Sequence, residues 1–202
     1  MGDRSPATTD RTDTANVLQE DTANGNSAQS VPAKSARHKR GRSPQQLTVV
    51  IDTREQLPFE FPPGVSTIAG TLATGDYSVL GYTGQISIER KSWADFYGCL
   101  TGSSRERFER ELQRLSELPY PAVVVEAAHD DLWRPYIYRV RGGRSRRSQV
   151  PPLVAQKSAI AWSWRYRIPF WFCGGRKQAA KWTLLMLMDA VRVIERERKA
   201  AE

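Results

Sequence analysis

The sequence predicts an α/β protein in which a mixed central β-sheet is flanked by helices. Residues 122–126 form a continuous apolar run, which is typical of a strand buried on both faces. Residues 105–118 place apolar side chains on one face of an amphipathic helix. Because this helix stands between a predicted hairpin and the buried strand, the order of the elements predicts a mixed sheet with helices packed on it.

The chain begins with a tail whose composition differs from that of the remainder. Residues 1–46 contain almost no large apolar side chains, so they cannot bury enough surface to offset the entropy lost on ordering. We predict a disordered basic tail over residues 1–46 and one folded domain over residues 47–202. Within the tail, residues 34–42 cluster lysines and arginines, which fits a phosphate-tracking arm and a solvated linker equally well.

Four short strands are predicted in the first half of the domain, at residues 47–51, within 66–74, at 76–80 and at 85–91. The first is rich in β-forming residues and ends at Asp52, which it would deliver to the carboxyl edge of the sheet. Residues 56–64 contain three prolines and form a loop. The turn at residues 81–84 joins the last two strands into a hairpin.

The second half alternates the two element types, with helices at residues 93–100, 105–118, 153–167 and from about 176 onward, and strands at 122–126 and 168–173. Between them, residues 130–152 predict an irregular, mobile and basic loop. Its arginines are Arg139, Arg141, Arg144, Arg146 and Arg147. Arginine grips phosphate and the nearby aromatic side chains can stack on a base, so the loop predicts a nucleic-acid contact surface, with a disordered insertion as the alternative.

The strand predicted at residues 85–91 carries the chemistry. Its period of two places Glu89 and Lys91 on one face and Arg90 on the other. Asp76 lies one strand earlier, close enough to join Glu89 around a divalent cation. Such an arrangement suits phosphodiester hydrolysis, in which carboxylates hold Mg²⁺ or Mn²⁺ and the lysine stabilises the developing charge. The alternative is an ordinary charged strand edge, where lysine discourages aggregation.

Two motifs in this region resemble those of a known family. Gly75 and Asp76, followed by Glu-Arg-Lys at residues 89–91 and by Asp95, resemble the nuclease signature of the XPF family of structure-selective DNA endonucleases. Residues 50–55, Val-Ile-Asp-Thr-Arg-Glu, are similar to the first-strand motif of that family. The resemblance implies a restriction-endonuclease-like nuclease fold over residues 47–202, of the ERCC4 type.

The resemblance also implies a set of site residues. The metal ligands it implies for Mg²⁺ or Mn²⁺ are Asp52, Asp76 and Glu89. It adds Arg90, Lys91 and Asp95 to the catalytic set and Arg54 and Glu55 as supporting residues. Strand alternation points Arg90 away from Glu89, however, and Asp95 also fits a structural role in the first turn of a helix capped by Ser92.

The charge and the resemblance together predict the partners. The formal net charge of +8 and the sequence pI of about 9.8 favour a polyanion, and DNA is the first candidate. Members of the family commonly form dimers through the nuclease domain, so a homodimer or a partner protein is expected. The chain has no room for the helix-hairpin-helix module that usually follows, and the basic tail together with the loop at residues 139–147, or alternatively a partner, would replace it. No membrane association is expected, and the predicted location is the cytoplasm, with the nucleoid in a bacterium.

The function expected from these residues is a metal-dependent DNA endonuclease that acts at branched or otherwise structured DNA. Roles in DNA repair or recombination are what the family implies. The alternative is a catalytically inactive module of the same fold that binds DNA or dimerises. A nuclease acting on RNA is a third option, which a comparison of substrates would separate from the first.

Overall fold

The computed structural model describes residues 47–202, and the predicted disordered tail over residues 1–46 lies outside the described residues. Six strands form one mixed sheet in the order β2-β1-β3-β4-β5-β8. The strands are β1 (Thr48–Asp52), β2 (Ser66–Gly70), β3 (Tyr77–Val79), β4 (Ile86–Ser92), β5 (Tyr120–Glu126) and β8 (Phe170–Phe172). β3 runs antiparallel to β1 and β4, while the other neighbouring pairs are parallel. The predicted mixed sheet is therefore confirmed.

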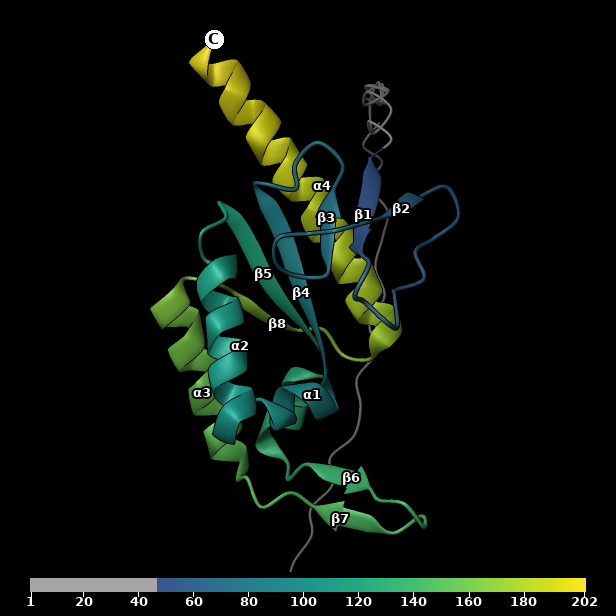
Figure 1. Ribbon diagram of the computed structural model, residues 1–202, viewed down its shortest axis with the longest axis vertical. Coiled ribbons are helices and arrows are strands. Elements are labelled where there is room, and N and C mark those ends of the chain that lie inside the picture. The colour runs from purple at the N-terminus through teal and green to yellow at the C-terminus, as the bar shows by residue number, and fades with distance from the viewer. Residues whose placement is uncertain (1–46) are drawn as a thin grey trace, which may run out of the picture. The chain divides into compact units, whose positions relative to one another are not determined.

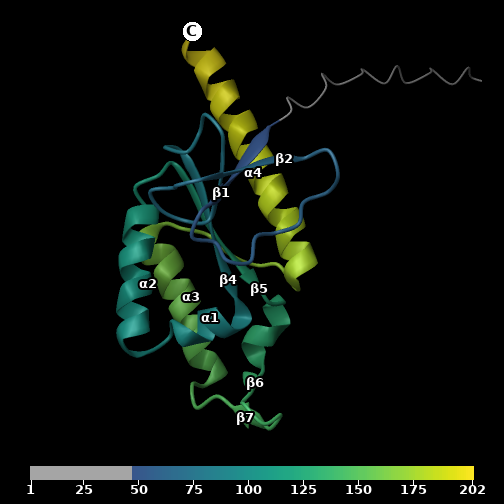
Figure 2. The same cartoon turned by 45° about the vertical axis from the view of Figure 1, so that its right-hand side comes forward.

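Helices cover both faces of this sheet (Figures 1 and 2). They are α1 (Trp93–Gly98), α2 (Gly102–Leu115), α3 (Pro152–Tyr166) and α4 (Arg176–Ala201), with a 3₁₀ turn η1 (His129–Trp133) after β5. The first three helices pack on one face, and α4 crosses the other. Across residues 47–202, no helix combines the length and apolar character needed to cross a membrane.

Two apolar clusters lie on opposite sides of the sheet. In β5, Val123 and Val125 pack with α1, α2 and α3, whereas Ala122 and Val124 pack with α4. The strand is apolar throughout because each of its faces is covered. The same two clusters show which side chains of the neighbouring strands point to each face of the sheet.

The α4 side of β1, β3 and β4 is apolar. Val49, Tyr77 and Ile88 belong to the cluster that packs against α4. Successive side chains in a strand point to opposite faces, so Asp52 and Glu89 lie on the other side of the sheet. Asp76, which directly precedes Tyr77, lies on that side too. The acidic residues at β1, β3 and β4 therefore gather on the face that carries α1 and α2, whereas Arg90 of β4 lies on the α4 side.

The prediction of an irregular loop at residues 130–152 is wrong, because this segment contains a second, two-stranded sheet. β6 (Ile137–Arg139) and β7 (Ser145–Arg147) pair antiparallel. The turn between them is made by Gly142 and Gly143, whose φ angles of 97° and 78° suit glycine. A run rich in arginine gives little β signal, and it is the cross-strand pairing that forms the hairpin.

Candidate active site

The backbones of β1, β3 and β4 bring three of the predicted carboxylates together. Asp52 ends β1, Asp76 directly precedes β3 and Glu89 lies within β4. The Asp52 N–H donates to the Asp76 carbonyl over 2.9 Å, and the Asp76 N–H donates to the Ile88 carbonyl over 2.9 Å. By strand alternation all three side chains share the face that carries α1 and α2.

Gly75 is required for this arrangement. Its φ of +72° lies in the left-handed region, and a Cβ at this position would come within 2.2 Å of the Ser87 Oγ. The Ser87 hydroxyl instead donates to the Thr74 carbonyl over 2.7 Å. The glycine in the Gly-Asp motif thus lets the chain approach β4 closely enough to set Asp76 beside Glu89.

Glu89 and Lys91 form a buried pair on β4. The Lys91 Nζ lies 2.5 Å from the Glu89 Oε1, and the Glu89 side chain is 5% exposed. The same ammonium sits 4.7 Å from the centre of the Phe108 ring on α2. The pair is therefore held between the sheet and α2, and Lys91 is directed along the face that carries the carboxylates.

The carboxyl groups of Asp76 and Glu89 lose their protons less readily than carboxyl groups in water, because the pKa of each is raised. Burial raises the pKa of Asp76 to about 6, against the hydrogen bond that its Oδ2 accepts from the Arg90 N–H, and the charge of Glu55 adds to the rise. Burial likewise raises the pKa of Glu89, against the attraction of Lys91. Burial alone would lower the pKa of Lys91, but Glu89 outweighs it and the pKa lies above its ordinary value. A cation bound here would displace protons.

Asp76→Asn is expected to stabilise the protein in chelator at pH 7 by about 1 to 3 kcal/mol. The folded wild type binds the Asp76 proton more tightly than the unfolded chain, so its stability falls as pH rises from about 4 to the folded pKa of about 6. The gain should therefore vanish below pH 4. Urea unfolding at both pH values measures it, and an equal gain at both would contradict the cause given. Added Mg²⁺ should stabilise the wild type and leave the variant unchanged.

Asp52 is engaged differently. Its Oδ1 accepts from the Arg54 N–H over 2.9 Å and from the Arg54 Nε over 2.7 Å, while its Oδ2 accepts from the Leu72 N–H over 2.7 Å. Burial would raise the pKa of Asp52, but these bonds outweigh it and leave the pKa below its ordinary value. The Arg54 guanidinium also donates to each Asp52 oxygen, and because its side chain is 66% exposed it can move away and free a lone pair of Asp52 for a cation.

Arg90 and Glu55 belong to an ion-pair network on the α4 side of the sheet. The Arg90 guanidinium donates to the Glu55 Oε2 and to the Glu126 Oε1, each over 2.8 Å. Arg176, the first residue of α4, donates to the same Glu126 oxygen and to the carbonyls of residues 57 and 58. The Arg90 side chain is therefore directed away from Glu89 and Lys91, and only its backbone N–H contacts Asp76.

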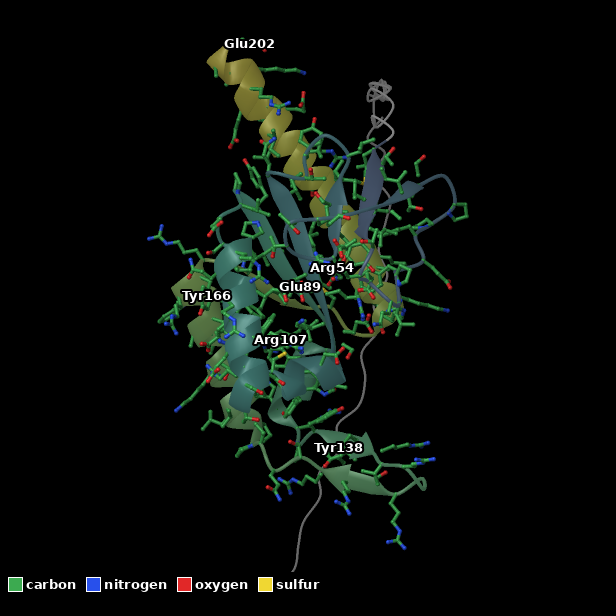
Figure 3. All side chains as sticks on the ribbon, viewed as in Figure 1. Arg54, Glu89, Arg107, Tyr138, Tyr166 and Glu202 are labelled. Carbon is green, nitrogen blue, oxygen red and sulfur yellow. The ribbon has the colours of Figure 1, made fainter. Side chains whose placement is uncertain are left out.

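Asp95 caps a helix. Its N–H donates to the Ser92 Oγ over 3.1 Å, and the Ser92 hydroxyl lies 2.6 Å from the Asp95 Oδ2. This reciprocal arrangement satisfies the start of α1, and Asp95 has no hydrogen bond to the carboxylates of β3 and β4. The hairpin arginines do not contact these carboxylates: Figure 3 shows Tyr138 of the hairpin at the lower end of the domain, below α1, while Glu89 lies near the middle.

No set of three or more histidine, cysteine or acidic side chains is arranged to hold a metal within residues 47–202. In the described domain, however, Asp76 Oδ1 and Glu89 Oε2 accept no hydrogen bond. The sequence predictions omitted Glu126 and Arg176, which complete the network. A carboxylate at the end of a buried strand was the available signal for Glu126, and nothing local indicated Arg176.

Comparisons with known proteins agree with the fold. A family model described as the ERCC4 domain matches residues 51–186. The solved structure of XPF from Aeropyrum pernix matches with a TM-score of 0.51 and 23% identity over 75% of this chain and 69% of that chain. XPF from Aeropyrum pernix in complex with DNA matches with a TM-score of 0.51 and 21% identity over 75% and 66%. No curated protein matches the chain.

Proposed function

Because the chain belongs to the ERCC4 domain family, we propose that it is a divalent-metal-dependent DNA endonuclease that hydrolyses phosphodiester bonds at branched or otherwise structured DNA. The resemblance of its motifs to the XPF type is confirmed by the family match and by the shared fold. The observation that carries the proposal is the set of Asp76, Glu89 and Lys91 on one face of neighbouring strands. A net charge of +8 and a fold neighbour solved with DNA support DNA as the substrate.

The donors fit Mg²⁺ or Mn²⁺. Hard cations prefer carboxylate oxygens, and Mg²⁺ is commonly bound by one or two carboxylates together with waters and substrate phosphates. Asp76 and Glu89 would hold the cation through their free oxygens, and Asp52 would join them after Arg54 releases it. When bound, the cation supplies polarisation of the phosphoryl oxygen and activation of water.

Two basic side chains act on the phosphate. Lys91 stays protonated beside Glu89, and its ammonium stabilises negative charge that develops on the scissile phosphate. Arg54 is largely exposed, and its guanidinium can exchange the Asp52 carboxylate for a phosphate in a charge-assisted bidentate contact. The same movement would free Asp52 as a further ligand.

The test is cleavage of labelled duplex, single-stranded, flap and four-way-junction DNA, and of matched RNA, with Mg²⁺, Mn²⁺ or chelator. Cutting that requires the metal, and that favours one branched substrate, is expected. Cutting of RNA alone would show that RNA, and not DNA, is the substrate.

One observation favours a second function, that of a catalytically inactive DNA-binding module. Both Asp52 oxygens are occupied, and no three-acid metal set is formed within the described domain. Binding of DNA without cutting of any substrate in either metal would establish this function.

We also propose that a second copy docks at the open edge of the sheet. Within residues 47–202, β8 pairs only with β5. Around its free edge lie Trp171 and Trp182, which stack with ring centres 5.4 Å apart and are 42% and 43% exposed, and Trp164, which is 81% exposed. Exposed aromatic side chains beside an unpaired strand are typical of a protein interface.

Trp164→Glu is expected to shift the protein from dimer toward monomer, because a carboxylate at this edge would be desolvated on association. Sedimentation velocity over a concentration series measures the shift. Leu80→Glu, at an exposed apolar position that follows β3 and lies away from β8, serves as the matched control. A wild type that stays monomeric throughout the series would exclude the homodimer and leave a different partner protein as the occupant.

A further inference from the structure

The hairpin of β6 and β7 carries a cluster of positive charge that no acidic residue interrupts. Between residues 132 and 151 the chain has no acidic residue, and its arginines are Arg134, Arg139, Arg141, Arg144, Arg146 and Arg147. All of them are exposed, and none has a carboxylate partner within residues 47–202. Unneutralised guanidinium groups on a projecting ribbon provide a binding surface for phosphates.

The arginines lie on both faces of this ribbon. Residues that oppose each other across an antiparallel pair share a face, and Tyr138 opposes Arg146 while Arg139 opposes Ser145. Arg147 opposes Ile137 and therefore shares the face of Arg139. One face thus carries Arg139 and Arg147, and the other carries Arg146 and, by the same alternation, Arg144, with Arg141 at the turn.

An aromatic column connects the hairpin with the catalytic strand. Tyr138 stacks on Tyr136 with ring centres 5.9 Å apart, and Tyr136 stacks on Tyr97 of α1 at 4.6 Å. Tyr97 in turn meets the edge of Trp93 at 4.7 Å, and Trp93 follows directly after β4. The hairpin is therefore seated on the elements that follow Lys91, so a duplex held by it is held in a fixed position relative to the site.

We propose that this hairpin inserts into the major groove of duplex DNA beside the scissile bond, with the arginines of each face on a different phosphate backbone. The inference rests on the proposed function for the choice of DNA as the substrate. It does not rest on cleavage, because binding to DNA needs no metal. The major groove is about 12 Å wide and admits a two-stranded ribbon, whereas the minor groove, about 6 Å wide, does not. A ribbon lying flat on one backbone would use the arginines of one face alone.

The first test compares the two faces in chelator, where no cleavage occurs. Arg139→Ala/Arg147→Ala and Arg144→Ala/Arg146→Ala are each expected to weaken binding to plain duplex roughly tenfold and to reduce the salt slope by about 1 to 2. The matched control, Arg196→Ala/Lys199→Ala, removes two exposed charges from the far end of α4 and should leave the slope unchanged. An effect of only one hairpin pair would overturn insertion, as would an effect of neither.

The second test identifies the groove. Methylation of guanine N7, which lies in the major groove, should interfere with binding at a few positions of a duplex, whereas a minor-groove ligand such as netropsin should not compete. The reverse result would overturn the proposal, and so would a preference for single-stranded DNA that is lost in the hairpin variants. Melting temperatures equal to that of the wild type show that the exposed substitutions leave the fold intact.

Substitutions of Tyr136 test whether the aromatic column positions the bound DNA relative to the active site, separately from the contacts that the arginines make with the DNA. Tyr136→Ala is expected to keep most of the binding but to spread the cleavage positions over several nucleotides, and Tyr136→Phe should restore a single position because it keeps the stack. Cut positions unchanged by Tyr136→Ala would overturn the coupling to the site. If the wild type binds but cuts nothing, the nuclease proposal fails, while the groove and salt tests still decide the binding mode.

Discussion

Glu89→Gln is expected to lower metal-dependent cleavage by roughly 10³-fold or more. Glutamine keeps the size of the side chain and can still accept the hydrogen bond from Lys91, but it removes the charge that a divalent cation requires. A substitution of Lys91 tests the other charged member of the pair. Lys91→Met keeps an unbranched stem against Phe108 but lacks the ammonium, so the rate of cleavage is expected to fall by about 10²- to 10³-fold.

Single-turnover cleavage under saturating enzyme measures these losses at the chemical step. Glu106→Gln, an exposed position on α2, is the matched control and should cut like the wild type. DNA binding in chelator should be retained by both site variants. If Glu89→Gln cut as fast as the wild type, Glu89 would have no part in holding a cation.

Arg90→Met is expected to lower the free energy of unfolding by about 3 to 5 kcal/mol. The guanidinium lies between the carboxylates of Glu55 and Glu126, and its side chain is only 10% exposed. Burial alone would lower the pKa of Arg90, yet these two partners outweigh it and raise the pKa. Removing Arg90 leaves Glu55 without a cation, whereas Glu126 keeps Arg176.

Urea unfolding in chelator measures the loss. Adding Glu55→Gln to Arg90→Met should recover part of it, because no unpaired buried charge then remains at that position. Arg192→Met, which removes an exposed pair with Asp189, should change stability by less than about 1 kcal/mol. A loss at Arg90 no larger than that at Arg192 would show that the network does not hold α4 to the sheet.

The sequence predicted those parts of the structure that repeat at short range. The period of two along β4 was enough to separate Glu89 and Lys91 from Arg90, and the apolar run before Glu126 was enough to predict a buried strand. The ion pair between Arg90 and Glu126 joins residues 36 positions apart, and no local pattern encodes it. The three hydrogen bonds that Arg54 donates to Asp52 are local, but they depend on the turn that follows β1.

The hairpin shows the opposite limit. Its arginines were predicted to contact nucleic acid, and that stays a prediction, but its regular structure could not be anticipated from strand propensity. Cross-strand pairing and the stack of Tyr136 on Tyr97 depend on where α1 is positioned. Tertiary contacts of this kind override weak local preferences.

The two faces of β4 impose different selection pressures on adjacent codons. On one face, burial disfavours the charges of Glu89 and Lys91, which pair with each other and serve the chemistry, whereas on the other Arg90 supports the fold. A library of all substitutions, sorted separately for cellular abundance and for cleavage, should therefore show abundance and activity responding at alternate positions along the strand. Because Glu89 neutralises the buried Lys91, a lineage relieved of selection for cleavage would gain stability by replacing both residues with apolar ones, so activity would be lost while the fold persists.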